Sequence, residues 1–280
     1  MCRWLAYMGS PVLVEDLLYR PQHSLIVQSL SSTLGAEPTN GDGFGLGWYT
    51  DRPTPSVFRS TEPAWNDRNL REISANITSP CVLAHIRAST GSPVQLTNCH
   101  PFRRGRWLFM HNGLVHGFHA AKRELAMAVD PSLYADIEGT TDTELFFYLA
   151  LTLGLEEDPP AAVARAVGLI EETCRRHGEA FPMQMTVATT DGVTFYGFRY
   201  SSEGRSRSLF HSADVSTLRQ QYPDNPLLAE LSDDARLVVS EPLGNLRGAW
   251  LEVPEATCVV IGGGRQEMRP FAPQPALAPA

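Results

Sequence analysis

The chain has 280 residues, 43% of them hydrophobic and 19% charged, a composition that can bury a large core and that excludes an intrinsically disordered chain. Its 31 acidic residues exceed its 23 basic residues and give a formal net charge of -8, which argues against a protein that binds nucleic acid or an anionic membrane. The N-terminus lacks the apolar stretch of a signal peptide, and no apolar run approaches the length of a membrane span. We therefore expect a cytoplasmic globular protein with no nucleic-acid or membrane partner.

Short aromatic and β-branched runs predict strands near both ends of the chain. These predicted strands cover residues 2–9, 43–50, 81–88, 106–112, 183–190, 193–200, 235–242 and 257–263. Between the two groups, apolar residues at helical spacing predict helices over residues 120–129, 141–153 and 159–178. Clustered strands with helices between them favour an α+β fold over a strict βαβ alternation.

The chain shows no internal repeat and no clear linker. We therefore predict a single domain over residues 1–268. Residues 269–280 are rich in Pro and Ala, a composition typical of a disordered tail.

The cysteine count is odd and includes no C-x-x-C pair, so a disulfide scaffold and a zinc ribbon are both disfavoured. The five are Cys2, Cys81, Cys99, Cys174 and Cys258. Cys2 directly follows the initiator Met1. If Met1 is removed, one residue carries both a thiol and a free α-amine, and that amine titrates at about pH 8, so it can act as the thiol's own base. The spacing alone equally fits an ordinary cysteine.

Two segments could serve either a ligand or the fold. The glycines of residues 40–47 lack the spacing of a phosphate-binding loop, and they more readily let the backbone pass close to a ligand or another strand. Arg87 ends an apolar strand, where a buried guanidinium needs a partner. That partner is either the carboxylate of a ligand or an internal Asp.

Two further segments carry polar groups suited to acyl transfer. The sequence His111-Asn112-Gly113 fits either a hairpin turn or an oxyanion hole made from the Asn112 amide and the Gly113 N–H. Asp142 lies in the first turn of a helix capped by Thr141, where it either complements the helix dipole or anchors a substrate ammonium.

A metal site is the main alternative chemistry. Five of the eight histidines fall between residues 85 and 119, next to Cys99, and zinc could use three of them. The five are His85, His100, His111, His116 and His119. Their spacing matches no zinc motif, so we expect no metal and no cofactor.

Taken together, the motifs resemble those of class II glutamine amidotransferases, the N-terminal cysteine branch of the Ntn hydrolases. The resemblance is greatest to the subgroup of the amidotransferase-like subunit of the yeast glutathione degradosome, and it extends to the γ-glutamyl-hercynylcysteine sulfoxide hydrolases of ergothioneine biosynthesis. The matching segments are MCRWL, RPQHSLIVQS, NGDGFG, PAWNDRNL, AHIRAST, TNCHPF, FMHNG, GTTDTE and SEPLGNLRGAWLEVP. The resemblance implies a four-layer αββα sandwich.

It also implies a role for each matching residue. Cys2 is the expected nucleophile and base, and Asn112 with Gly113 the expected oxyanion hole. Arg87 is expected to bind the α-carboxylate of a γ-glutamyl group and Asp142 its α-ammonium. His111 and Thr90 are expected among the substrate-binding residues.

The implied activity is hydrolysis of a γ-glutamyl amide through a γ-glutamyl thioester, with glutathione or another γ-glutamyl compound as substrate. The length leaves no room for the synthase domain of the large amidotransferases, which favours a separate hydrolase. Two alternatives stay open: a glutaminase subunit that supplies ammonia to a separate synthase, and a non-catalytic regulatory subunit or γ-glutamyl sensor. A peptidase-like partner subunit and a homo-oligomer also stay open.

Overall fold

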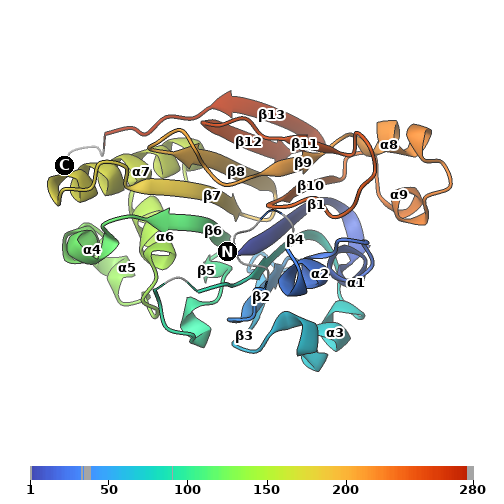
Figure 1. Cartoon of the computed structure of the whole chain (residues 1–280), viewed down its shortest axis with the longest axis horizontal. Coiled ribbons are helices and arrows are strands. Elements are labelled where there is room, and N and C mark those ends of the chain that lie inside the picture. Colours follow the sequence, from blue (N-terminus) through green and yellow to red (C-terminus); the bar gives the residue numbers. More distant parts are fainter. Residues whose placement is uncertain (1, 33, 35–38, 90, 276–280) are drawn as a thin grey trace.

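The structure, a computed structural model, describes residues 2–32, 34, 39–89 and 91–275. Two antiparallel sheets stack in the centre of the molecule (Figure 1). In spatial order, the first sheet contains β11 (Trp250–Glu252), β9 (Phe210–Ser212), β10 (Arg236–Val239), β1 (Arg3–Leu13), β4 (Thr78–Ile86), β2 (Phe44–Trp48) and β3 (Ser56–Ser60). The second contains β13 (Arg265–Pro270), β12 (Thr257–Gly262), β8 (Thr194–Ser201), β7 (Met183–Thr190), β6 (Trp107–Val115) and β5 (Phe102–Arg104).

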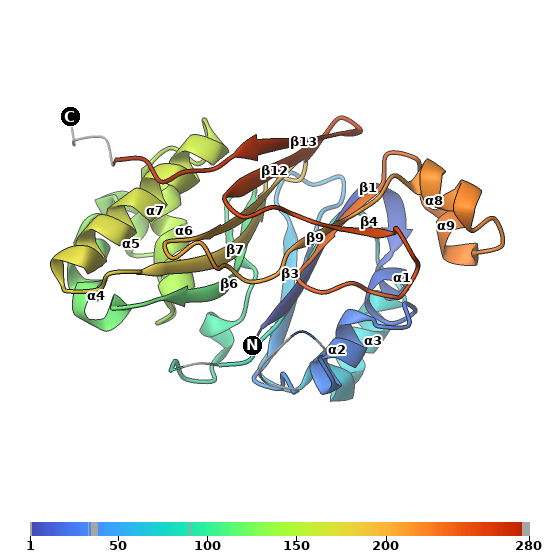
Figure 2. The ribbon, with the colours of Figure 1, turned by 45° about the horizontal axis from the view of Figure 1, so that its top comes forward.

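Helices cover the outer face of each sheet (Figure 2). The second sheet is covered by α4 (Phe118–Met127), α5 (Pro131–Tyr134), α6 (Asp142–Thr152) and α7 (Pro159–Arg176). The first sheet is covered by α1 (Val14–Leu18), α2 (Leu25–Leu30) and α3 (Arg68–Ser74), while α8 (Val215–Gln221) and α9 (Pro226–Glu230) form an arm at one end of the molecule. Two short 3-10 turns, Ala64–Asn66 and Leu96–Asn98, lie in the connections.

Alternation along the central strands explains the layering. In β1, Leu5 contributes to the core beneath the helices, whereas Trp4 lies in the core between the sheets. In β6, Phe109 faces the helices and Met110 faces the other sheet. Since both faces of these strands are buried, the strands are apolar almost throughout. The predicted four-layer αββα sandwich is confirmed.

Side chains cap the starts of α6 and α7, and the Thr141 cap of α6 is the one predicted from the sequence. The Oγ1 atom of Thr141 accepts from the Glu144 N–H at 3.2 Å at the start of α6, and an Asp158 carboxylate oxygen accepts from the Ala161 N–H at 3.2 Å at the start of α7. The Glu144 carboxylate accepts from the N–H groups of Glu138 and Gly139 at 3.0 and 2.7 Å. These bonds tie the loop that enters α6 to the first turn of the helix.

Two sequence-based interpretations need correction. His111-Asn112-Gly113 is not a hairpin turn, because β6 continues through it to Val115 and pairs with β7 along that length. The start of the predicted tail is also too early. Strand β13 runs to Pro270, Phe271 packs edge-on against Phe198, and the Gln274 N–H donates to the Ala164 carbonyl on α7 at 3.0 Å. Residues 276–280 lie outside the described part.

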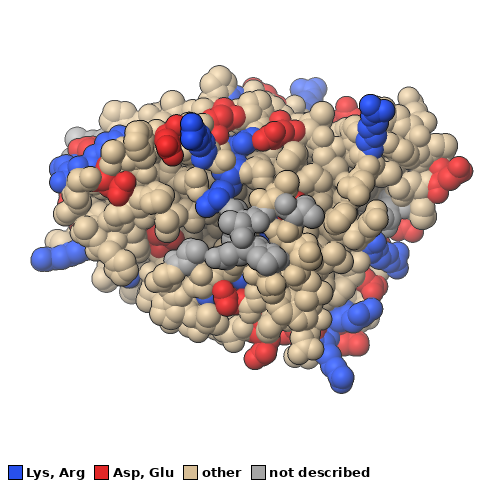
Figure 3. Space-filling view, viewed as in Figure 1, with Lys and Arg blue, Asp and Glu red and all other residues tan. Residues whose placement is uncertain are grey.

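The surface carries charges of both signs. On the face seen in Figure 3, acidic and basic side chains are interspersed. Among the described residues, no helix combines the length and the apolar character needed to cross a lipid bilayer.

Candidate active site

A cavity of about 560 Å³ lies beside the start of β1. Its walls come from the first residues of the chain, the loop after β4, the end of β6, the first turn of α4 and the start of α6. Five of the seven predicted site residues line it together: Cys2, Arg87, His111, Gly113 and Asp142. Thr90, which was predicted to contact substrate, lies outside the described residues.

Cys2 is held at its side chain and at its backbone. The Ala88 N–H donates to Cys2 Sγ at 3.3 Å, and Sγ lies 3.4 Å from the Ala88 carbonyl oxygen. The Cys2 carbonyl oxygen accepts from Asn112 Nδ2 at 2.9 Å and from Arg3 Nη1 at 3.0 Å. Burial raises the pKa of the Cys2 thiol, while the bond from Ala88 and the charges of Arg87 and Arg3 lower it. The thiol thus has a fixed position next to two cations.

Arg3 ties the nucleophile to the last third of the chain. Its Nε atom lies 2.8 Å from a Glu241 carboxylate oxygen, and both side chains are 3% exposed. Next to this pair, Ser240 Oγ accepts from the Trp4 N–H at 3.0 Å. Arg3 and Glu241 were not singled out from the sequence. The available signals were the position of Arg3 next to a candidate nucleophile and the Ser-Glu-Pro sequence after a predicted strand.

Arg87 is equally buried but differently paired. Among the described residues, no carboxylate lies within 4.0 Å of its guanidinium, so the internal Arg–Asp bridge considered from the sequence does not form. Nη2 donates to Ser92 Oγ at 2.7 Å and to the Pro93 carbonyl at 3.1 Å, and Nη1 makes one longer contact of 3.4 Å to the Asp42 carbonyl. The charge lies against neutral oxygens at the wall of the cavity.

The glycine-rich segment supports the loop after Arg87. The Asp42 carboxylate accepts from the Ser89 N–H at 2.7 Å, and the Gly43 carbonyl accepts from the Arg87 N–H at 2.8 Å. At Gly45, a Cβ atom would stand 2.0 Å from the His100 carbonyl oxygen. The expectation that these glycines allow a close backbone approach is confirmed at this contact.

Asp142 reaches the cavity from the start of α6. One carboxylate oxygen accepts from the Val115 N–H at 2.9 Å and the other from the Thr143 N–H at 2.8 Å. A carboxylate has further lone pairs, so these bonds orient it and still leave capacity for an ammonium group.

Asn98, which was not singled out from the sequence, braces both predicted anchors. It is fully buried, and its Nδ2 donates at 3.0 Å to the Pro93 carbonyl that also receives Arg87. Its Oδ1 accepts from the Thr140 N–H at 2.9 Å, two residues before Asp142. The two anchors are therefore connected through one side chain.

His111 and Gly113 occupy alternate positions at the end of β6. Because the Gln184 carbonyl at 3.4 Å can only accept, His111 Nε2 carries the proton and Nδ1 accepts from Thr143 Oγ1 at 2.9 Å. Burial lowers the pKa of His111, which the Asp142 charge opposes. Gly113 has a φ of 148°, and a Cβ atom there would lie 1.8 Å from the Gln184 carbonyl oxygen, so only glycine fits.

Asn112 does not line the cavity directly. It is 2% exposed and lies behind Cys2, with its Oδ1 atom 3.0 Å from His85 Nε2. His85 in turn lies 2.9 Å from His100 Nδ1. Across the described ranges, no group of three or more His, Cys, Asp or Glu side chains is arranged to hold a metal ion. The other four cysteines are free and buried.

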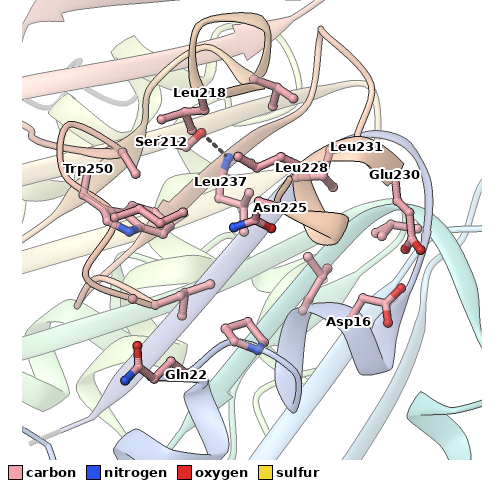
Figure 4. Close-up of a pocket in the computed structure, with 18 of the residues that line it drawn as sticks. Asp16, Gln22, Ser212, Leu218, Asn225, Leu228, Glu230, Leu231, Leu237 and Trp250 are labelled. Atoms are coloured by element: carbon pink, nitrogen blue, oxygen red, sulfur yellow. Dashed lines mark hydrogen bonds between the residues drawn. The ribbon is translucent and has the colours of Figure 1, made fainter. Parts of the chain in front are cut away.

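A second cavity of about 420 Å³ lies between α1 and the α8–α9 arm (Figure 4). Leucines from several elements line it, with the Trp250 ring at one side and the carboxylates of Asp16 and Glu230 at another. None of the predicted site residues reaches it. The chemistry-bearing residues gather in the cavity beside Cys2.

Comparisons with known proteins show which family the chain belongs to. The family described as "Glutamine amidotransferases class-II" matches residues 21–196. The chain is 34% identical to the probable glutamine amidotransferase DUG3 of Saccharomyces cerevisiae, over 93% of this chain and 82% of that protein. It is 30% identical to the gamma-glutamyl-hercynylcysteine sulfoxide hydrolase of Mycolicibacterium smegmatis, over 86% of this chain and 99% of that protein.

A solved structure shares the whole fold. The glutamine aminotransferase class-II domain protein of Silicibacter pomeroyi superposes with a TM-score of 0.74 at 34% identity, over 98% of this chain and 100% of that one. The family match covers more than half of the chain and includes the loop of Arg87, the end of β6 and the start of α6. The chain has the αββα layers and matches the family over more than half of its length. It therefore belongs to the class II glutamine amidotransferases, a family of amidohydrolases.

Proposed function

We propose that this protein hydrolyses γ-glutamyl amides, with Cys2 as the nucleophile and a γ-glutamyl thioester as the intermediate. The observation that carries the proposal is the charged lining of the cavity that also holds the Cys2 thiol. It pairs a buried Arg87, which contacts no carboxylate among the described residues, with an oriented Asp142. A guanidinium and a carboxylate joined through Asn98 suit the α-carboxylate and α-ammonium of one amino acid.

The chemistry follows from that placement. Removal of Met1 frees the Cys2 α-amine, which takes the thiol proton. Sγ then bonds to the γ-carbonyl carbon, and the carbonyl electron pair moves to oxygen, where the Gly113 N–H and the Asn112 amide are the proposed donors. When the oxyanion collapses, the C–N bond breaks and the amine leaves with the proton. Water then attacks the thioester, which releases glutamate and restores the thiol.

Substrate identity is proposed from the relatives. Their printed names are those of a glutamine amidotransferase and of a γ-glutamyl-hercynylcysteine sulfoxide hydrolase, which supports γ-glutamyl compounds as a class. Glutathione is the substrate that we propose first, because the motifs resemble those of the degradosome subunit and the chain is 34% identical to DUG3 over 93% of its length. A peptidase-like partner subunit stays a prediction of that resemblance, and a cytoplasmic location stays a prediction from the sequence.

The test is a hydrolysis panel with glutamine, glutathione, γ-glutamyl amines and γ-glutamyl-hercynylcysteine sulfoxide, and with glutamate release as the readout. Intact mass first establishes that Met1 is absent. We expect turnover of at least one γ-glutamyl compound and none by Cys2→Ala, while Cys2→Ala still binds the substrate. Turnover by Cys2→Ala would contradict the nucleophile. Glutamine as the sole substrate would favour an ammonia-supplying subunit, and binding without turnover a γ-glutamyl sensor.

A further inference from the structure

We propose that His85 is a positioning residue for the nucleophile: its Nε2–H fixes the Asn112 carboxamide, which in turn holds the Cys2 carbonyl. The inference rests on the proposed function and adds a residue that does not line the Cys2 cavity. The contacts behind Cys2 form one chain of hydrogen bonds that runs from His85 through Asn112 to Cys2.

The two sheets bring these residues together. In β4, Cys81 and Leu83 face the core between the sheets, and His85 continues the same side of the strand. In β6, Leu108 and Met110 face that core from the opposite sheet, and Asn112 continues their side. His85 and Asn112 therefore meet across the inter-sheet layer, directly behind the first residue before β1.

The direction of each hydrogen bond follows from elementary donor chemistry. Asn112 Nδ2 lies 2.9 Å from the Cys2 carbonyl oxygen, which can only accept, so the amide nitrogen must face Cys2. Asn112 Oδ1 then faces His85 Nε2 at 3.0 Å and can only accept, so His85 carries its proton on Nε2. A flipped carboxamide would lose the bond to Cys2 and set its oxygen against the Cys2 carbonyl oxygen.

His100 holds the imidazole of His85 in place. The two rings meet edge to face, with centroids 4.1 Å apart and an interplanar angle of 64°. His100 Nδ1 lies 2.9 Å from His85 Nε2. It accepts a second hydrogen bond from the same Nε2–H, which Asn112 and His100 share. The close approach of the His100 backbone to Gly45 keeps this loop against the first sheet.

His85 is hydrogen-bonded through only one of its two ring nitrogens. It is fully buried, yet its Nδ1 atom has no hydrogen-bond partner within the described residues. An unsatisfied buried polar atom is destabilising, and a phenyl ring at this site would avoid that cost. The chain has an imidazole here although only its Nε2 side is bonded, as expected of a residue that donates to Asn112.

Two amide substitutions separate this role from packing. In His85→Gln, the amide nitrogen can take the place of Nε2 and donate to Asn112. In His85→Asn, the shorter side chain takes the place of Nδ1 and does not reach. We expect His85→Asn to lower kcat for the γ-glutamyl substrate about 100-fold with little change in KM, because a slightly displaced nucleophile slows attack far more than binding. His85→Gln should remain within about tenfold of the wild type.

Equal losses in both variants, or a loss confined to KM, would overturn the proposal. A second measurement does not depend on turnover or on the stability of any variant. Imidazole ¹⁵N spectra of the wild-type protein should show His85 as the neutral Nε2–H tautomer, and an Nδ1–H tautomer would refute the inference. If the wild type hydrolyses no γ-glutamyl compound, the proposed function fails while the tautomer still tests the hydrogen-bond chain.

Discussion

Two buried arginines flank Cys2, and the fold treats them in opposite ways. Arg3 and Arg87 are each 3% exposed. Arg3 is paired with the equally buried Glu241 and donates to the Cys2 carbonyl, whereas Arg87 contacts only neutral oxygens among the described residues. Burying a guanidinium costs several kcal/mol unless a charge compensates it. We infer that Arg3 stabilises the fold around Cys2, and we propose that the charge of Arg87 pairs with a ligand carboxylate.

Breaking the Arg3 pair should have the largest effect on stability. Glu241→Gln leaves a buried guanidinium without its carboxylate, and we expect the free energy of unfolding to fall by about 3–5 kcal/mol. Denaturant unfolding of the purified protein measures this change. The double variant Arg3→Met/Glu241→Met should recover most of the loss, because an apolar pair of similar volume replaces the ion pair. If Glu241→Gln changes the free energy of unfolding by less than about 1 kcal/mol, the Arg3 pair does not stabilise the fold and Arg3 does not differ from Arg87 in this respect.

Removing the other charge should affect catalysis instead. We expect Arg87→Gln to reduce kcat/KM for the γ-glutamyl substrate by an amount equivalent to about 2–5 kcal/mol, since it leaves the substrate carboxylate unpaired. Free glutamate should raise the Tm of the wild type, and this increase should disappear in Arg87→Gln. Arg87→Lys keeps the charge but loses the planar fork, so it should recover only part of the activity. A large loss of stability in Arg87→Gln, with unchanged kcat/KM, would reverse the assignment.

His85 shows a third way to bury a basic group, and it predicts a pH dependence. An arginine cannot lose its proton in a protein, but a histidine can. Burial lowers the pKa of His85 to about 3. Between that value and the pKa of about 6.5 in the unfolded chain, the unfolded state binds more protons, so stability falls as the pH falls. At pH 5 this group alone should cost about 2 kcal/mol relative to neutral pH.

Chemical denaturation at pH 5 and pH 7 tests that contribution, with His85→Gln as the matched control. The control cannot titrate, so its stability should change less between the two pH values. If the two proteins lose the same stability on acidification, His85 is not the group responsible.

An exposed arginine should give the smallest effect. Arg104 pairs with Asp136 at 2.7 Å, but the two side chains are 41% and 45% exposed. We expect Arg104→Ala to change the free energy of unfolding by less than about 1 kcal/mol and to leave kcat/KM unchanged. A larger effect would show that pairing alone, rather than burial, distinguishes these arginines.

The layers of the fold follow from sequence periodicity, but its edges do not. The central strands are buried on both faces and are rich in apolar and β-branched residues, so β4 and β7 were predicted within a few residues. The short edge strands β3 and β5 carry exposed polar residues and depend on a neighbour for their hydrogen bonds. The arm formed by α8 and α9 is likewise too short for its periodicity to show.

The cavity could be predicted in part. Cys2, Arg87, Gly113 and Asp142 carry distinctive chemistry in short motifs, and they do come together. The residues that hold them act across long separations: Glu241 is 238 residues from Arg3, and Asn98 is 42 residues from Thr140. No local pattern reports such pairings. The continuation of the predicted strand beyond Asn112 was hidden as well, because Asn-Gly is a turn signal that pairing with β7 overrides.

The Arg3–Glu241 contact has a consequence for biosynthesis. Contacts between residues far apart in a chain form late, since the long loop between them must close first. Until β10 and the residues after it have left the ribosome, Arg3 lacks its carboxylate and the first residues of the chain lack the strand beside β1. Cys2 therefore spends most of translation without these neighbouring contacts. Its precise placement begins only when the last third of the protein has been made.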